Sequence, residues 1–304
     1  MNNKIKKINL NHSFIFFFAV NIFTFLIFKL SNVNISTLLC LFLILIIGVS
    51  HGSLDHIKGE KLLELFNIQY IYLFYLLYIL VALVTILTWI LLPSITLMLF
   101  LIVASYHFGK EDTEFLVVNK SYITEIFYFF KGFLIILAPL YFHFQDTVNI
   151  FKLLLIHNEV FYSFLGFVEA NKIIEIGIIV STLSSIFLFL NKFEMKKFSI
   201  LLDYFSIIIL NYYLPPLIAF TIYFCFLHSI RHSISLALEL DSENLFNGFK
   251  IFVKKAIPLT ILTGVFCLIS LYLLNSGNNL DASVIKVIFI GLASLTFPHI
   301  LLEY

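Results

Sequence analysis

Long apolar runs follow one another along almost the whole chain and are separated by short polar breaks. A bilayer core about 30 Å thick requires about 20 apolar residues in a helix. On this rule the pattern predicts ten membrane-spanning helices, at 13–30, 35–51, 68–92, 94–108, 122–142, 173–190, 198–213, 217–238, 251–274 and 283–302. The runs 94–108 and 198–213 are short, and either could be re-entrant. Counts of eight or nine helices are therefore alternatives.

Proline and polar clusters divide these runs. Pro93, the Pro215-Pro216 pair and the segment 275–279 are typical helix terminators, because they remove backbone donors or free the backbone. The segment 146–171 is amphipathic and too polar to cross, so we expect it to lie along a membrane surface. No loop is long enough for a second domain. The sequence predicts one all-α domain, 1–304, built as a polytopic membrane bundle.

Composition supports the same fold class. The chain is 61% hydrophobic and 12% charged, with a mean hydropathy of +1.03. A soluble globular protein of this length would not tolerate such a surface. The net charge of +1 gives no reason to expect a nucleic acid partner.

The distribution of basic residues predicts the topology. With a cytoplasmic N-terminus, 14 of the 19 basic residues face the cytoplasm. The remainder, Lys29, Lys131, Lys152, Lys172 and Lys286, lie outside or within a span. This positive-inside bias indicates a multi-pass protein of the cell (inner) membrane with both termini in the cytoplasm.

Six of the nine histidines fall in four short motifs inside or beside apolar runs. The motifs are HGSLDH (His51 and His56), YHFG (His107), HSIRH (His228 and His232) and FPH (His299). Ionisable side chains in hydrocarbon are costly, so a cluster of them indicates function. With the predicted topology, four helices place these motifs about 17 to 24 Å from the outer face, at a rise of 1.5 Å per residue. A single layer of imidazoles predicts a metal site.

The spacing within each motif ranks the candidate ligands. His228 and His232 are at i and i+4, on one helix face, which lets two imidazoles reach one metal. His51 is preferred to His56 because it still belongs to the apolar helix. His107 lies near a helix end, where an interfacial position for its side chain is the competing interpretation.

Other polar groups are candidates for positions behind the ligands. We expect Asp55 and His56 to be outer groups of the HGSLDH motif, and Arg231 lies beside the histidine pair. His299 has Glu303 at i+4, and such a carboxylate could orient an imidazole through its second nitrogen. The other histidines, His12, His143 and His157, are most simply solvated interfacial residues.

Four imidazole ligands favour redox chemistry. Imidazole suits iron, copper or zinc, but zinc with four histidines would form a closed structural site. Fe(II) prefers five or six ligands, which leaves one or two positions for dioxygen. HExxH, GxSxG, GxxxxGK and GxGxxG are absent, so metalloprotease, serine hydrolase and nucleotide-binding chemistry are not indicated.

The ordered motifs resemble the Brp/Blh family of bacterial and archaeal integral membrane β-carotene 15,15'-dioxygenases. The resemblance rests on HGSLDH, on HFG followed by Lys110, Glu111 and Asp112, on HSIRH and on FPH, and it runs from Gly48 to His299. It implies Fe(II)-dependent and O2-dependent cleavage of β-carotene to two molecules of all-trans-retinal. A retinal-binding rhodopsin would be a natural acceptor of that product. The iron ligands it implies are His51, His107, His228 and His232, whereas it assigns no role to Asp55, Arg231 or Glu303.

Two other classes remain as alternatives. A membrane di-iron desaturase or hydroxylase acting on lipid also uses histidine boxes, but it needs about eight ligands and typically shows HxxHH, which is absent. One metal per chain would favour the dioxygenase, and two would favour this rival. A bis-histidine haem carrier or cation transporter would place its histidines at the membrane midplane or in opposed pairs.

Overall fold

The fold is known from a computed structural model that describes residues 2–30, 35–117, 121–277 and 279–303. These residues form helices and no strand, as the hydropathy pattern predicts. In chain order the helical segments are α1 (Asn2–Leu30), α2 (Thr37–Leu43), η1 (Ile44–Gly48), η2 (Val49–Leu54), α3 (Asp55–Leu65), α4 (Ile71–Leu91), α5 (Pro93–Glu111), η3 (Glu114–Leu116), α6 (Tyr122–Phe142), α7 (Phe144–Leu153), α8 (Glu159–Ala170), α9 (Ile173–Leu190), η4 (Met195–Lys197), α10 (Phe198–Tyr213), α11 (Pro216–Ile222), η5 (Tyr223–Ser229), α12 (Ile230–Leu240), α13 (Leu245–Asn275) and α14 (Leu280–Glu303).

Every predicted span falls on one of these helices or on a continuous run of them. Within the described residues, eight helical stretches are long and apolar enough to cross a membrane: Lys4–Ile27, Thr37–Leu65, Ile71–Leu91, Tyr122–Phe142, Ile173–Leu190, Pro216–Leu240, Leu245–Asn275 and Leu280–Leu302. The predicted spans 94–108 and 198–213 become α5 and α10, which are outside this set. α10 has only 16 residues, and α5 ends in the polar segment SYHFGKE. The chain is therefore a polytopic all-α membrane protein.

Several helices extend beyond their predicted limits into polar sequence. α1 begins at Asn2 and includes Lys4, Lys6 and Lys7, and α13 begins at Leu245, six residues before the apolar run 251–274. Hydropathy marks only the part of a helix that suits hydrocarbon, whereas capping decides where the helix begins. At α13 the Asn244 side chain caps the helix by accepting hydrogen bonds from two backbone N–H groups.

The prolines behave as expected at two of the breaks. Pro93 is the first residue of α5 and Pro216 the first residue of α11, the positions where a missing backbone N–H costs least. Pro298 instead lies inside α14, which continues through it to Glu303. The helix that carries His299 is therefore a single helix.

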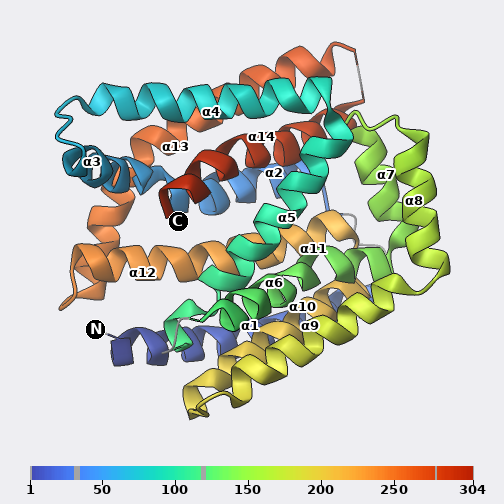
Figure 1. Ribbon diagram of the computed structural model, residues 1–304, viewed down its shortest axis with the longest axis horizontal. Coiled ribbons are helices and arrows are strands. Elements are labelled where there is room, and N and C mark those ends of the chain that lie inside the picture. The colour runs from blue at the N-terminus through green and yellow to red at the C-terminus, as the bar shows by residue number, and fades with distance from the viewer. Residues whose placement is uncertain (1, 31–34, 118–120, 278, 304) are drawn as a thin grey trace.

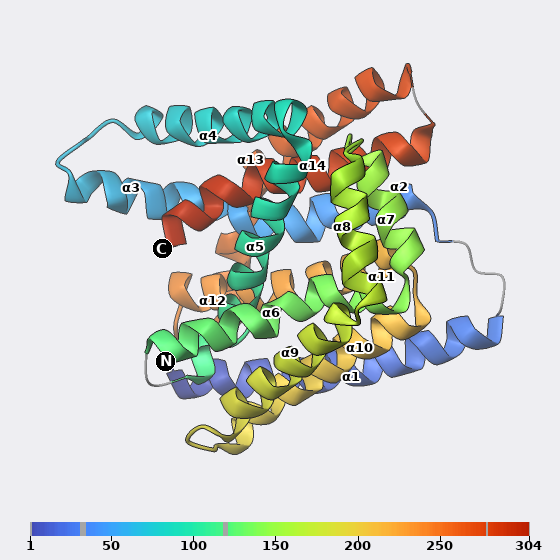
Figure 2. The ribbon, with the colours of Figure 1, turned by 45° about the vertical axis from the view of Figure 1, so that its right-hand side comes forward.

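The long helices run roughly side by side, and the two chain ends lie toward the same end of the bundle in both views (Figures 1 and 2). α5 crosses obliquely between them. The short helices α7 and α8, which cover most of the amphipathic segment 146–171, stand at the right-hand side of the bundle in Figure 1.

A close crossing with α6 fixes the carboxyl end of α5. A Cβ atom added to Gly109 would lie 1.8 Å from the Tyr128 carbonyl oxygen, and one added to Gly132 would lie 1.9 Å from the Ser105 carbonyl oxygen. Only glycine allows the two backbones to approach so closely. This crossing sets the position of the end of α5, where His107, Glu111 and Asp112 lie.

The segment Pro216–Leu240 is the most enclosed of the eight stretches, whereas the most apolar window of Leu245–Asn275 has no buried residue. In a membrane, a helix whose most apolar part has no buried residue, such as α13, faces lipid there. The enclosed segment carries the HSIRH motif and runs through the interior of the bundle. The polar residues of that motif are therefore kept from lipid.

Candidate functional site

Four histidines from separate parts of the chain gather in the interior of the bundle. His107 comes from α5, His228 from η5, His232 from α12 and His299 from α14, and all four are buried. Their ring centroids are 5.3 Å apart for His107 and His228, 5.3 Å for His107 and His299, and 5.9 Å for His232 and His299. His107 and His299 are therefore the central members of this histidine cluster.

Carboxylates hold three of the four rings at Nδ1. The pairs are His228 with Asp112 Oδ1 at 3.1 Å, His232 with Glu111 Oε2 at 3.0 Å, and His299 with Asp55 Oδ1 at 2.8 Å. A carboxylate accepts only, so Nδ1–H is the donor in each pair. A ring held in this way can bind a metal only through Nε2, and carboxylate–histidine pairs of this kind are typical of metal sites.

The order of residues along α5 explains two of these pairs. Glu111 lies one helical turn after His107, and Asp112 is the residue that ends the helix. One short segment therefore contributes one histidine of the cluster and the carboxylate partners of two others. Because the Gly109–Gly132 contact fixes this segment, it also fixes the pairs.

Asp112 is deeply buried, and its carboxylate contacts groups from the interior of the bundle. Its Oδ2 accepts a hydrogen bond of 2.7 Å from the Tyr223 hydroxyl. Burial opposes ionisation of Asp112, but the hydrogen bond from His228, together with the charges of Lys131 and Arg231, lowers the pKa of its carboxyl well below the usual value. The carboxylate that holds His228 is therefore ionised at neutral pH.

Arg231 lies outside the histidine cluster and ties its surroundings together. Its guanidinium group donates to both oxygens of Asp203, at 2.7 and 3.1 Å, to Ser13 Oγ at 2.8 Å and to the Asp112 backbone carbonyl at 3.2 Å. These partners come from α10, from α1 and from the end of α5. Arg231 is thus a buried structural link that positions Asp112 through its backbone.

Two π-helices lie directly at the histidine motifs. η1 ends at Gly48, just before the 3-10 segment that contains His51, and η5 includes His228. π-Helices are rare and occur frequently at functional sites, because the extra residue per turn redirects side chains. At η5, this geometry sends His228 toward His107, while His232, on the α-helix that follows, contacts His299.

The structure places the remaining candidates differently. The backbone of His51 lies in η2, but its side chain and that of Glu303 are outside the described part of the chain. His56 is only partly buried; its Nδ1 donates to the Ser53 carbonyl and its ring stacks near Tyr75. The partner found for His299 is Asp55 of the HGSLDH motif. Asp55 thus lies behind an imidazole of the cluster, and His56 has contacts of its own elsewhere.

The prediction for His12 was wrong. Its Nε2 donates to the Phe226 carbonyl at 2.9 Å, so this residue links α1 to η5 instead of facing solvent. His157 is exposed, as expected. His143 Nδ1 lies 3.8 Å from Asp146 Oδ2 at the start of α7. A histidine near the end of a hydropathy run can face either water or a neighbouring helix, and hydropathy does not distinguish the two.

Sequence reasoning did not assign roles to several residues of the site. The residues missed were Glu111, Asp112, Tyr78, Asp203 and Tyr223. Glu111 and Asp112 follow HFG at the end of a helix in an apolar protein, and this position could have marked them as residues of the site. The pairing of each carboxylate with a distant histidine was not visible in the sequence.

The donor groups of the histidine cluster can be compared with those that iron prefers. Within the described residues, no three histidine, cysteine, aspartate or glutamate side chains are positioned to hold a metal as they stand. The described cluster is a chain of neighbouring rings, and the His51 side chain lies outside the described residues. The chemistry nevertheless fits iron, since imidazoles are held through Nδ1 by buried carboxylates, with no thiolate among the contacts.

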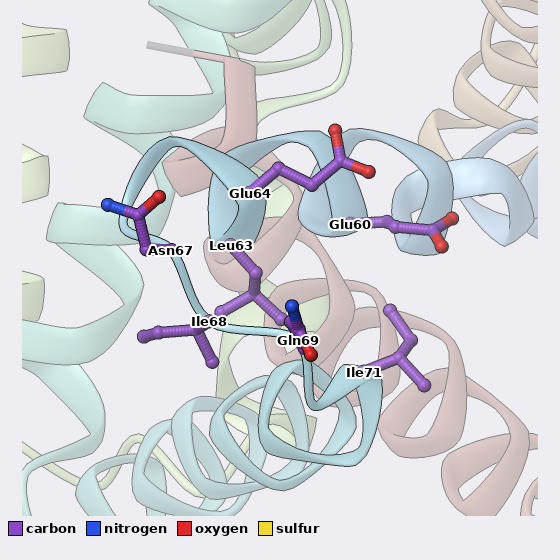
Figure 3. Close-up of a pocket in the computed structure, with 7 residues that line it drawn as sticks. All are labelled: Glu60, Leu63, Glu64, Asn67, Ile68, Gln69 and Ile71. Atoms are coloured by element: carbon purple, nitrogen blue, oxygen red, sulfur yellow. The ribbon is translucent and has the colours of Figure 1, made fainter.

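A pocket at the turn between α3 and α4 is separate from the cluster. Glu60, Leu63, Glu64, Asn67, Ile68, Gln69 and Ile71 line it, and no histidine is among them (Figure 3). Its carboxylate and amide groups suit water better than an apolar ligand. The pocket is not part of the candidate site.

Comparison with known proteins supports one family. The family model described as "Beta-carotene 15,15'-dioxygenase" matches residues 42–304. A relative named Beta-carotene 15,15'-dioxygenase, from an uncultured marine bacterium 66A03, is 28% identical over 272 residues, which cover 86% of this chain and 90% of the relative. No solved structure shows a significant match. The matched region contains all four histidine motifs.

Proposed function

Because the chain belongs to the β-carotene 15,15'-dioxygenase family, we propose that it is a membrane enzyme that cleaves β-carotene with O2 at the central 15,15' double bond. The products would be two molecules of all-trans-retinal. The two atoms of O2 become the two aldehyde oxygens, so the reaction balances without an external reductant. The iron ligands we propose are His51, His107, His228 and His232.

One observation of the structure supports this proposal above the others. Imidazoles from four separate elements meet in the bundle interior, and three of them are paired with carboxylates at Nδ1. Buried ionisable groups on this scale would be costly in a protein that only needed to pack helices in lipid. The arrangement is the one expected for histidines that bind a metal through Nε2.

Bound Fe(II) would supply the redox chemistry that allows O2 to react with an alkene. The protein contributes the positions of the groups around it. Asp112 and Glu111 hold two of the proposed ligands, His228 and His232, in one tautomer and orientation. Tyr223 donates to Asp112 and so restrains the carboxylate itself.

Aromatic side chains separate His228 from water. Phe108 packs edge-on against the ring, with centroids 4.7 Å apart, and Phe224 stacks on it at 5.9 Å. An apolar wall of this kind excludes water from the reacting centre and suits a polyene. We propose that aromatic residues on this side hold β-carotene in register with its central double bond at the metal.

The position in the bilayer suits the substrate. β-Carotene is an apolar rod that dissolves in the membrane core, so an enzyme embedded there meets it without extracting it. We propose that the protein lies in the inner membrane with both termini in the cytoplasm, and that retinal passes through lipid to a rhodopsin. The di-iron desaturase is the alternative, and it requires two metals per chain.

Expression in a bacterium that makes β-carotene tests the proposal. Cells producing the wild-type protein should lose their orange colour and accumulate retinal, whereas cells producing H228A at the same level should keep the colour. Retinal should be identified by chromatography, because bleaching alone does not show where the polyene was cut. Intact colour with a well-expressed, iron-loaded protein would contradict the proposal.

A further inference from the structure

The last helix brings an imidazole between two others of the histidine cluster. His299 of α14 is 4% exposed, and its ring meets those of His107 and His232 edge-on, at interplanar angles of 83° and 76°. Its ring centroid lies 5.3 Å from that of His107 and 5.9 Å from that of His232. His299 thus occupies a position inside the cluster.

Asp55 holds this ring firmly. His299 Nδ1 lies 2.8 Å from Asp55 Oδ1 and 2.9 Å from Oδ2, although the two residues are 244 positions apart in the chain. The Tyr78 hydroxyl donates to Asp55 Oδ2 at 3.0 Å. Tyr78 therefore restrains the carboxylate, which in turn restrains the imidazole.

The same three-residue arrangement occurs at a proposed ligand. At His228, Asp112 Oδ1 receives the imidazole Nδ1–H and Oδ2 receives the Tyr223 hydroxyl, at 3.1 and 2.7 Å. The two Tyr–Asp–His sets are built from different helices, α4, α3 and α14 in one case and η5 with the end of α5 in the other. A histidine that served only to join α14 to α3 would not require its carboxylate partner, Asp55, to be held in turn by a tyrosine.

We propose that His299 is a further ligand of the metal, through Nε2, and that Asp55 and Tyr78 position it. This inference rests on the proposed function, because it concerns the same metal. With His51, His107, His228 and His232 it would give five imidazoles, leaving one of the six positions that Fe(II) can offer. The metal would then have a ligand from α14 in addition to the proposed ligands from η2, α5, η5 and α12.

Iron affinity measured by chelator competition tests the inference on the purified full-length protein. H299A should bind Fe(II) more than about 100-fold more weakly than wild type, and D55N about 10-fold to 100-fold more weakly, the usual range for loss of a carboxylate behind a ligand. The matched control is H56Q, in the same motif as Asp55, because His56 contacts Ser53 and Tyr75 and not the cluster. H56Q should leave the affinity unchanged.

Two further measurements separate a ligand from a structural residue. Added imidazole should restore iron binding to H299A, because it can occupy the space of the missing side chain and supply the same nitrogen. The electron paramagnetic resonance spectrum of the Fe(II)–nitric oxide adduct should change in H299A with imidazole omitted and return toward that of wild type when imidazole is present. A structural role would produce neither effect.

The outcomes distinguish this inference from the proposed function. If H299A binds iron as tightly as wild type while H228A does not, the assignment of His299 is overturned and the proposed function stands. If H299A loses iron and added imidazole fails to restore binding to a protein that remains folded by circular dichroism, the assignment is likewise overturned. If wild type itself binds no iron, the proposed function fails and this inference fails with it.

Discussion

Asp112 and His228 are 116 positions apart in the chain, yet the Asp112 carboxylate lies 3.1 Å from His228 Nδ1 inside the membrane bundle. The second carboxylate oxygen accepts from Tyr223, which precedes His228 by five residues in the same π-helix. The contact therefore fixes both the tautomer of His228 and the direction of its Nε2. It also couples the end of α5 to the segment that carries the HSIRH motif.

Replacing Asp112 should weaken metal binding more than it affects folding. In D112N the neutral amide offers a weaker acceptor to Nδ1–H, so we expect iron affinity to fall about 10-fold to 100-fold. Chelator competition on the purified protein measures this change. D146N is the control, because Asp146 is an exposed carboxylate near another histidine, His143. Equal iron affinity in D112N and wild type would show that the carboxylate does not act on a ligand.

The α5–α6 crossing predicts a sharp difference between glycines. In G109A the new methyl group would meet the Tyr128 carbonyl, so the helices must separate, and we expect a loss of about 1 to 3 kcal/mol of stability. Thermal unfolding in detergent, followed by circular dichroism, measures this loss. G264A is the control: Gly264 lies in α13 with nothing within 4 Å of the added Cβ, and alanine favours a helix. A G109A protein as stable as G264A would contradict the crossing.

The fold class follows directly from the sequence, because a bilayer selects long apolar helices whatever their partners. The same signal explains the errors at helix ends. Asn2 to Lys7 continue α1 as a helix although they are too polar for hydrocarbon, and hydropathy measures only the latter. The predicted spans 94–108 and 198–213 were uncertain because their apolar runs are short. They are the two that fall outside the eight spanning stretches.

Site prediction from the sequence reached the histidines and named Asp55 as an outer group, but it gave no role to Glu111 and Asp112, which hold two of the rings. A rare imidazole in an apolar run is conspicuous by itself, so His107, His228, His232 and His299 could be selected without knowing the fold. A carboxylate partner is determined by packing between distant segments. Glu111 and Asp112 follow His107 in the chain but pair with the rings of His232 and His228.

His299 shows the limit of local spacing as a guide. Its i+4 neighbour Glu303 was the candidate partner by spacing, whereas the carboxylate found at Nδ1 is Asp55, from the other end of the chain. The proposed ligand set of His51, His107, His228 and His232 stays a prediction, since the His51 side chain is outside the described residues. Measured metal binding by single variants is what can test it.

The buried ion pair between Arg231 and Asp203 should matter for stability. In D203N the guanidinium loses its counter-charge in a buried setting, and removing one partner of such a pair costs about 3 to 5 kcal/mol. We expect a lower unfolding temperature for D203N, measured as for G109A. The double variant R231M/D203L removes both charges and should recover part of that loss. If the double variant is less stable than D203N, the bonds of Arg231 to Ser13 and to the Asp112 carbonyl matter more than the ion pair.

Metal content distinguishes the mononuclear dioxygenase from the di-iron alternative. We expect one iron per chain in the wild-type protein, measured by plasma emission spectroscopy against protein from amino-acid analysis. H228A should lose both iron and retinal formation, because His228 contacts His107 and is held by Asp112 within the cluster. H157A is the control: His157 is exposed and remote in sequence from every motif, and its loss should change neither quantity. Two irons per chain would favour the desaturase class, and a wild-type iron content in H228A would remove this residue from the ligand set.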